Sequence, residues 1–284
     1  MSRERLFQSA GIVARFDKKE SLKLAKELVD HLYKKGVEVF VEETLPSELH
    51  KHAKAIPLNQ MKTDFVITIG GDGTILRTCL ALPKPEPPIL AINMSVRGFL
   101  TEAEPKQALE AVEKCLQGKY IIEKCMKLSA ATKETKFPDA LNEVVTIAEE
   151  PTKLLYMRIM KDKEHIVNCQ ADGLMVSTQT GSTGYSLSAG GPVLDPQVNS
   201  FVLTPLCPLT PFHPIVFPAK TKLTIEIEKP KRILVIIDGH YRQLVSSEPL
   251  EITVTKSRNA TSFIRMQENF YHRLRSRLLF KGNG

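Results

Sequence analysis

Apolar residues in the first hundred positions follow two alternating patterns. Short, mainly apolar runs that predict strands occupy four segments: 11–14, 37–41, 64–69 and 88–92. The run at 64–69 is of the continuous kind that is buried in parallel sheets. Residues 21–35 instead carry leucines at helical spacing from Leu22 to Leu32, and Gly36 stands where a helix stop is expected. This βαβ order predicts an α/β domain over residues 1–100, with helices on both faces of a parallel sheet.

The pattern changes beyond residue 100. Residues 105–116 have helical character, and from Tyr120 onward short, partly alternating runs are separated by Pro, Gly and Asn. The candidate strands cover 141–147, 154–160, 173–177, 223–227, 233–237 and 250–254. They predict an all-β sandwich domain over residues 101–267. Residues 268–280 form a basic segment whose apolar side chains recur at helical spacing.

Composition narrows the class of protein. The longest apolar runs are too short to cross a bilayer, and the first residues lead into no signal-peptide core, so we expect a cytoplasmic protein with no membrane partner. Five scattered cysteines without a CxxC pair indicate neither a disulfide framework nor a zinc site, and we assign no metal ligands. The net charge of +7 is spread along the chain. Small phosphate-rich ligands explain this charge as well as nucleic acid does, and we expect no nucleic-acid partner.

A glycine-rich turn follows the apolar run that ends at Ile69. Gly70, Gly71, Asp72, Gly73 and Thr74 come directly after this run, and a helical pattern begins at residue 75. Backbone N–H groups in such a turn can approach an anion closely, and the helix dipole adds attraction, so phosphate is the expected ligand. The turn is neither a Walker A loop nor a GxGxxG motif. Arg77, one turn into the helix, is either a phosphate contact or a solvated helix residue.

Asp72 is the informative residue of this turn. A carboxylate among phosphate-binding amides repels the ligand unless it holds a metal, accepts a hydrogen bond from a sugar hydroxyl or abstracts its proton. The structural alternative is an Asp-Gly turn in which Asp72 caps the helix. We predict the functional role, because a purely structural turn accepts Asn equally well.

A second polar cluster follows the strand pattern at 172–178. Its sequence is Gly-Ser-Thr-Gly-Tyr-Ser-Leu-Ser-Ala-Gly-Gly-Pro, over residues 181–192. The hydroxyl and glycine residues offer hydrogen bonds to ribose or phosphate, and Tyr185 offers a ring for stacking on a base. The alternative is a flexible loop, although flexible linkers seldom follow a buried strand so directly.

Two shorter motifs complete the candidates. Asn142 and Glu143 place an amide beside a carboxylate, a pair able to clamp vicinal hydroxyls or a metal. Asp238-Gly239-His240 follows the apolar run 233–237 and by itself is typical of an ordinary hairpin turn, with His240 on the surface.

Taken in order, these motifs resemble the NAD kinase family over nearly the whole chain. GGDGT at 70–74 is shared with diacylglycerol and sphingosine kinases, whereas GSTGYSLSAGGP at 181–192 is much more specific. The resemblance implies a Rossmann-like N-terminal domain and a β-sandwich C-terminal domain, with NAD bound in the crevice between them. It also implies that the C-terminal segment 268–284 returns to the first domain, and that the protein is a homodimer or homotetramer.

The resemblance further implies roles by motif position. Asp72 resembles the family's general base, and His240 resembles a nucleotide contact. Asp172 matches an aspartate that meets the nicotinamide end of NAD across a subunit interface. The full set of implied ligand contacts is Gly71, Asp72, Gly73, Thr74, Arg77, Asn142, Glu143, Lys153, Gln170, Asp172, Thr183, Gly184, Tyr185, Ser186, Leu187, Ser188 and His240. Many family members have Ala at the position of Gly184 and Pro at that of Gln179, differences that bear on loop rigidity and on donor or NADH preference.

The expected reaction is phosphorylation of the adenosine-ribose 2′-hydroxyl of NAD to give NADP. The donor is Mg²⁺-bound ATP or polyphosphate, and Asp72 accepts the hydroxyl proton. One alternative is a lipid or sugar kinase sharing GGDGT, whose acceptor does not explain the loop at 181–191. Another is a sensor that binds a dinucleotide without turning it over, which has no need of a base.

Overall fold

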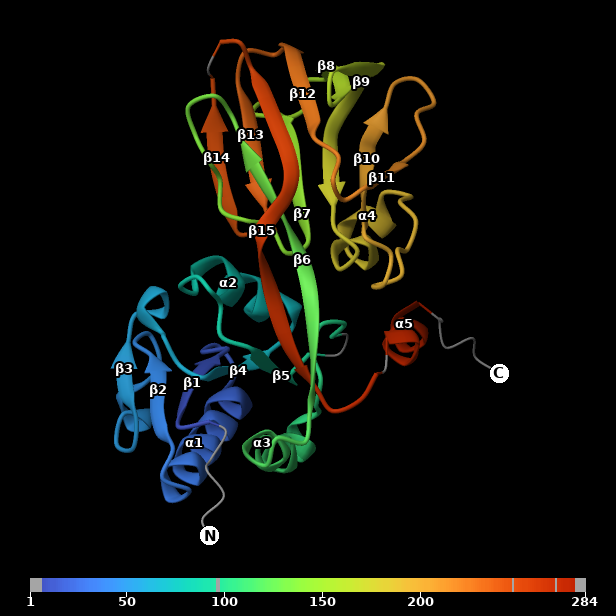
Figure 1. Cartoon of the computed structure of the whole chain (residues 1–284). Coiled ribbons are helices and arrows are strands. Elements are labelled where there is room, and N and C mark those ends of the chain that lie inside the picture. Colours follow the sequence, from blue (N-terminus) through green and yellow to red (C-terminus); the bar gives the residue numbers. More distant parts are fainter. Residues whose placement is uncertain (1–6, 96–97, 247, 269, 279–284) are drawn as a thin grey trace. The chain divides into compact units, whose positions relative to one another are not determined.

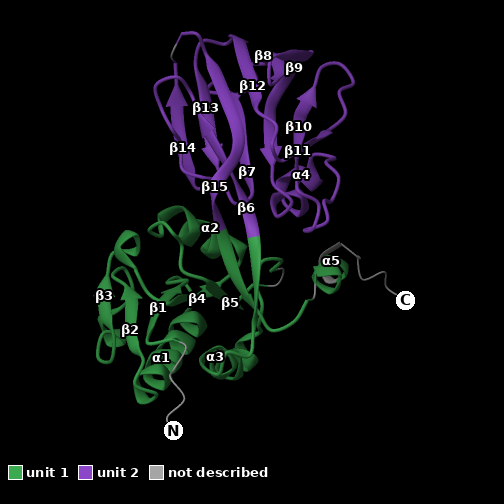
Figure 2. Ribbon diagram, in the orientation of Figure 1, with its two compact units in different colours: residues 1–124, 261–284 green, residues 125–260 purple. Residues whose placement is uncertain are grey.

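The computed structural model describes residues 7–95, 98–246, 248–268 and 270–278 (Figure 1). Contacts divide the chain into two compact units (Figure 2). Unit 1 comprises residues 1–124 and 261–284, and unit 2 comprises residues 125–260. Strands β6 (Ile121–Ala131) and β15 (Glu251–Arg265) each run from one unit into the other.

Unit 1 is an α/β structure built on a parallel sheet. Its strands are β1 (Ser9–Ala14), β2 (Glu38–Glu42), β3 (Lys54–Ile56), β4 (Phe65–Gly70) and β5 (Ile89–Asn93), in the order β3-β2-β1-β4-β5. All of these pairs are parallel, and the end of β15 joins β5 where Phe263 lies opposite Ile89. The central strand β4 is buried along its whole length, which is why its sequence is continuously apolar.

The described part of unit 1 contains α-helices as well as the sheet. They are α1 (Lys19–Lys34), α2 (Asp72–Ala81), α3 (Ala108–Leu116) and α5 (Phe270–Leu278), with short 3₁₀ turns at Ser47–Leu49, Leu58–Gln60 and Pro105–Gln107. Helix α1 buries Leu24, Leu28 and Leu32, the leucines whose spacing predicts it.

Unit 1 extends to residue 124, beyond the expected boundary at residue 100. The reason is helix α3, whose residues Ala108, Val112 and Cys115 lie in the same buried cluster as the sheet residues Ile12 and Ile67. The C-terminal helix α5 also belongs to unit 1, in agreement with the expectation for the C-terminal segment, of which residues 269 and 279–284 lie outside the described residues.

Unit 2 is rich in antiparallel strands. Besides β6 and β15 it contains β7 (Glu143–Ala148), β8 (Leu155–Lys161), β9 (Glu164–Ser177), β10 (Ser200–Pro208), β11 (Ile215–Pro218), β12 (Leu223–Lys229), β13 (Ile233–Ile237) and β14 (Tyr241–Val245). The path of pairing runs β14-β13-β7-β9-β8-β12-β15, and β10 pairs with β9 and β11. A 3₁₀ turn (Gly181–Thr183) and the short helix α4 (Tyr185–Ser188) follow β9.

Strand β9 connects the two groups of strands in unit 2. Its first half pairs with β8 from Glu164 to Ala171, and its second half pairs with β7 and β10 from Gly173 to Ser177. The α/β character of the first domain and the β-rich character of the second are therefore as predicted. No helix within the described ranges is long and apolar enough to span a membrane.

Candidate functional site

The glycine-rich turn of unit 1 lies at the carboxyl end of β4. Gly70 ends this strand, and α2 begins at Asp72. A Cβ atom on Gly70 would lie 2.2 Å from Oγ1 of Thr74, and one on Gly71 would lie 3.0 Å from the Cβ of Ser95. Both glycines therefore leave room that neighbouring side chains fill. Gly73 is exposed, and the other turn residues from Gly71 to Thr74 are partly exposed, so an anion can approach the first turn of α2.

The carboxylate of Asp72 does not cap its own helix. The N-cap position belongs to Gly71, and Asp72 occupies the first turn. Its Oδ1 accepts hydrogen bonds from the N–H groups of Phe99 and Leu100, both at 3.0 Å, and its Oδ2 accepts from Phe99 at 3.1 Å. The N–H groups of Phe99 and Leu100 thus fix the orientation of the Asp72 carboxylate.

The guanidinium of Arg77 is paired with a carboxylate, and its side chain is 37% exposed. Its guanidinium forms a two-pronged ion pair with Glu42 of β2, in which Nη2 lies 2.8 Å from Oε2 and Nη1 contacts Oε1. The hydrogen bond to Glu42 raises the pKa of Arg77 above its ordinary value. Because Glu42 is buried, Arg77 compensates a carboxylate that would otherwise be desolvated without a partner.

In unit 2, Asp238 anchors the turn that carries Asn142 and Glu143. Its buried carboxylate accepts hydrogen bonds from the N–H groups of Leu141 and Asn142 at 2.7 Å and of Glu143 at 3.0 Å. The N–H of Asp238 in turn donates to the carbonyl oxygen of Glu143 at 3.0 Å. Sequence reasoning missed this role, because an Asp-Gly pair after an apolar strand is typical of any hairpin.

Glu143 and Asn142 present buried polar atoms without a protein partner. Among the described residues, neither Oε2 of Glu143 nor Oδ1 of Asn142 has a hydrogen-bond partner. Burial, followed by repulsion from Asp238, raises the pKa of Glu143 to about 8. Burial also raises the pKa of Asp238, against the opposing effects of its three N–H donors and of buried Lys127. Buried polar atoms of this kind are normally hydrogen-bonded, so the two unpaired oxygens mark this turn as unusual.

The loop after β9 packs directly against this turn. Oγ1 of Thr178 donates to the carbonyl oxygen of Leu141 at 2.6 Å and accepts from the N–H of Gly181 at 3.0 Å. A Cβ atom on Gly181 would lie only 2.2 Å from the carbonyl oxygen of Asn142. A Cβ atom on Gly184 would instead lie 3.8 Å from Nδ2 of Asn142 and 3.9 Å from Oε2 of Glu143. Gly184 therefore borders the unpaired Oε2 of Glu143.

The loop is an ordered structure rather than a flexible linker. Oγ of Ser182 donates to the carbonyl oxygen of Gln179 at 2.6 Å and accepts from the N–H of Leu194 at 3.0 Å. Oγ of Ser186 and Oγ1 of Thr204 form a buried hydrogen bond at 2.9 Å. Thr183 and Ser186 are buried, Leu187 is half-buried, and Tyr185 and Ser188 are exposed. The ring of Tyr185 is therefore accessible for stacking.

The remaining predicted contacts lie elsewhere on unit 2. Asp172 is exposed on β9, five positions before Ser177, which pairs with Glu143; this spacing corresponds to about 17 Å along the strand. Gln170 is half-buried on β9, opposite Tyr156 of β8. Lys153 is exposed in the turn before β8, and His240 is exposed in the turn between β13 and β14.

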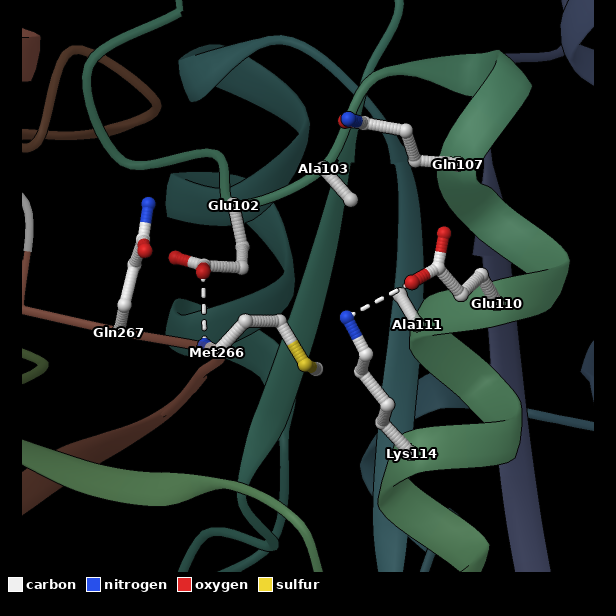
Figure 3. Close-up of a pocket in the computed structure, with 8 residues that line it drawn as sticks. All are labelled: Glu102, Ala103, Gln107, Glu110, Ala111, Lys114, Met266 and Gln267. Carbon is white, nitrogen blue, oxygen red and sulfur yellow. Dashed lines mark hydrogen bonds and ion pairs between the residues drawn. The ribbon is translucent and has the colours of Figure 1, made fainter.

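Unit 1 also contains a pocket that no sequence motif predicts. It has a volume of about 230 Å³ and lies between α3 and residues 266–267, with Glu102, Gln107 and Lys114 among its lining residues (Figure 3). None of the predicted site residues lines it. Within the described ranges, no group of three or more His, Cys, Asp or Glu side chains is arranged to hold a metal ion.

Comparison with known proteins identifies the family of this chain. Residues 10–120 match the ATP-NAD kinase N-terminal domain, and residues 141–266 match the ATP-NAD kinase C-terminal domain. The NAD kinase of Methanothermobacter thermautotrophicus is 38% identical over 96% of this chain and 96% of its own length. The chain belongs to the NAD kinase family.

Other NAD kinases support the same assignment. The NAD kinase of Thermococcus sibiricus is 40% identical over 92% of this chain and 95% of its own length. A crystal structure of an NAD kinase from Archaeoglobus fulgidus in complex with ATP has a TM-score of 0.77 at 30% identity and covers 94% of this chain and 99% of that chain. Yeast NADH kinase complexed with NADH, at 24% identity and a TM-score of 0.85, covers 99% of this chain and 90% of that chain and shows the shared fold.

Both groups of site residues fall inside the matched NAD kinase ranges. The turn from Gly70 to Thr74 lies in the N-terminal match, and the turn at Asn142 and the loop from Gly181 lie in the C-terminal match. The relatives are phosphotransferases by name, which favours the kinase interpretation over the dinucleotide sensor and over the lipid or sugar kinase.

Proposed function

We propose that this chain phosphorylates the 2′-hydroxyl of the adenosine ribose of NAD, with Asp72 as general base and ATP or polyphosphate as donor. The observation that carries the assignment of the base is the geometry of Asp72. Its carboxylate is held by two backbone N–H groups in a turn whose own amides suit phosphate. A residue fixed in this way meets the orientation requirement of general-base catalysis without a conformational search.

The proposed chemical step conserves all atoms and charges. Asp72 accepts the 2′-hydroxyl proton while the oxygen attacks the γ-phosphorus in line; the bond to the β,γ-bridging oxygen breaks, and ADP leaves. The divalent cation, Mg²⁺ in our proposal, enters bound to the triphosphate oxygens and is part of the donor substrate. The N-terminal amides of α2 and the turn residues Gly71, Gly73 and Thr74 offset the negative charge of the phosphates.

In unit 2, the proposed role of Asn142 and Glu143 is to bind sugar hydroxyls. The buried Oδ1 of Asn142 accepts a hydrogen bond from one hydroxyl. Because the pKa of Glu143 is raised to about 8, this side chain is mostly protonated at pH 7 and can donate through its own O–H. A vicinal diol supplies both partners, because one hydroxyl can donate to Asn142 while the oxygen of the other accepts from Glu143.

The loop and the strand β9 supply the proposed outer contacts. Tyr185 stacks on a base, and the N–H and hydroxyl groups from Thr183 to Ser188 bind polar parts of the dinucleotide. Gln170, Asp172, Lys153 and His240 are proposed contacts at more distant parts of NAD, with Asp172 acting in a homodimer or homotetramer. We also propose a cytoplasmic location, with no membrane or nucleic-acid partner.

The test is NADP formation by purified protein, coupled to an NADP-specific dehydrogenase. NAD, Mg²⁺ and either ATP or polyphosphate are supplied, and Asp72→Asn is compared with Asp17→Asn, an exposed aspartate of the same unit. We expect a loss of kcat of roughly 10²–10⁴-fold for Asp72→Asn and none for Asp17→Asn. Near-native turnover of Asp72→Asn with NAD still bound refutes the assigned base. Tight NAD binding by calorimetry without NADP formation from either donor supports the sensor instead.

A further inference from the structure

The C-terminal part of unit 1 holds the same backbone segment that donates hydrogen bonds to Asp72. On one side, the N–H groups of Phe99 and Leu100 donate to the Asp72 carboxylate. On the other, Nη1 of Arg265, near the end of β15, donates to the carbonyl oxygen of Leu100 at 2.8 Å. Leu100 is therefore fixed between the catalytic turn and a residue 165 positions away in the sequence.

Arg265 is itself part of a network of four charged side chains, in which Glu123 is 24% exposed. Its Nε lies 2.6 Å from Oε2 of Glu123, and its Nη1 lies 3.4 Å from Oε2 of Glu102. Arg273 of α5 approaches the same two carboxylates, with Nη1 3.8 Å from Oε2 of Glu102 and Nη2 3.5 Å from Oε1 of Glu123. The side chain of Glu102 is 2% exposed and those of the two arginines 4% and 10%. Removing one arginine from such a network leaves a desolvated carboxylate undercompensated.

Backbone contacts tie this network to the segment after β5. Oε1 of Glu102 accepts a hydrogen bond from the N–H of Met266 at 2.7 Å, which Figure 3 shows beside the pocket. The N–H of Glu102 donates to the carbonyl oxygen of Ala91 in β5 at 2.8 Å. The segment that follows Phe99 is therefore linked to both the parallel sheet and the end of β15.

Helix α5 also contacts Phe99 through its side chain. The ring of Phe270 meets the ring of Phe99 edge-on, with centroids 5.8 Å apart and an interplanar angle of 89°. The guanidinium carbon of Arg273 lies 5.9 Å from the centroid of the Phe99 ring. Edge-to-face ring pairs and cation–π contacts favour one orientation, so both restrict the residue whose N–H donates to Asp72.

We propose that Arg265 and Arg273 are positioning residues for the catalytic base, acting through Phe99 and Leu100 on the orientation of the Asp72 carboxylate. The end of β15 and helix α5 thus hold Phe99 and Leu100, and through them the orientation of the Asp72 carboxylate. This inference rests on the proposed function, because it requires Asp72 to be the base. Misplacement of a reacting group by about 1 Å costs up to about 10²-fold in rate. Loss of the contacts made by Arg265 or Arg273 is therefore expected to lower kcat rather than substrate affinity.

Arg273 offers the sharper test, because α5 contains a matched control. Arg275, two positions away on the same helix, is exposed. We expect Arg273→Gln to lower kcat roughly tenfold or more with the KM for NAD and for ATP within about twofold. We expect Arg275→Gln to match the wild type, and Arg273→Lys to recover part of kcat because it retains a cation beside Phe99 and the carboxylates. Rates are measured below each variant's melting temperature, so loss of folded protein is not counted as loss of kcat.

A double-mutant cycle separates positioning from a general loss of structure. If Arg273 acts through Asp72, Arg273→Gln lowers the residual rate of Asp72→Asn by less than about twofold. Recurrence of the full loss in the Asp72→Asn background overturns the proposal, as does a wild-type kcat for Arg273→Gln. If Arg273→Gln does not fold, Phe270→Leu, which leaves every charge in place, is expected to lower kcat by roughly two- to fivefold, and an unchanged kcat overturns the proposal. Near-native turnover of Asp72→Asn is a different result, which refutes the proposed base.

Discussion

Replacing Glu143 by Gln is expected to change how the stability of the protein depends on pH. The folded protein holds this buried carboxyl with a pKa of about 8, against an ordinary value of 4.5. Between these values the folded state keeps a proton that the unfolded chain releases. The free energy of unfolding therefore falls as the pH rises from about 4.5 to about 8, and above that range the loss from Glu143 is complete and constant. Glutamine carries no titratable proton, so Glu143→Gln removes this dependence.

The size of the effect follows from the two pKa values. Each pKa unit corresponds to about 1.4 kcal/mol, so the whole cost of ionising the buried side chain is roughly 5 kcal/mol. The part that falls between pH 6 and pH 9 is roughly 2–3 kcal/mol. Solvent screening reduces this value little, because Glu143 is only 7% exposed.

Urea denaturation at several pH values from 6 to 9 measures this difference directly. The wild type should lose roughly 2–3 kcal/mol more across this range than Glu143→Gln does. Glu228→Gln, an exposed glutamate on β12 of the same unit, should lose as much as the wild type. Parallel curves for the wild type and Glu143→Gln would refute the protonated state of Glu143, and with it the proposed hydrogen bond from Glu143 to the ribose.

Three other replacements test the architecture around the site. Gly181→Ala places a methyl group 2.2 Å from the carbonyl oxygen of Asn142. We expect the free energy of unfolding in urea to fall by roughly 1–3 kcal/mol, and NAD binding measured by calorimetry to weaken. Unchanged binding contradicts the packing of the loop against Asn142. Arg77→Met leaves buried Glu42 without its arginine and should lower the free energy of unfolding by roughly 1–3 kcal/mol. A second replacement, Glu42→Met, should restore part of this loss. Additive effects of the two replacements contradict an energetic coupling between Arg77 and Glu42. Asp238→Asn replaces one acceptor oxygen by an amide that donates, and this amide faces backbone N–H groups. The melting temperature should therefore fall by several degrees in scanning calorimetry. An unchanged melting temperature contradicts the role of Asp238 in holding the turn at Asn142.

Local sequence patterns predict the elements that carry the site. A buried strand, three glycines and a helix follow each other directly between residues 65 and 81, so the turn at Asp72 can be predicted from local spacing. The same holds for the strand that begins at Glu143 and for the hairpin at Asp238, because alternation and turn residues act over short distances. The division into an α/β part and a β-rich part follows from the same patterns.

Tertiary structure alone decides how these side chains are held. Asp238 accepts a hydrogen bond from the backbone N–H of Asn142, which lies 96 positions away in the sequence. Likewise, Glu42 pairs with Arg77 across 35 positions, and the carbonyl oxygen of Leu100 accepts from Arg265 across 165 positions. A local pattern cannot specify such pairs, because each partner taken alone is an ordinary turn aspartate, a strand glutamate or a surface arginine. The raised pKa of Glu143 has the same origin, since burial and the nearby Asp238 exist only after the chain has folded. The sequence therefore determines which residues are available for chemistry, and the fold determines their protonation, orientation and partners.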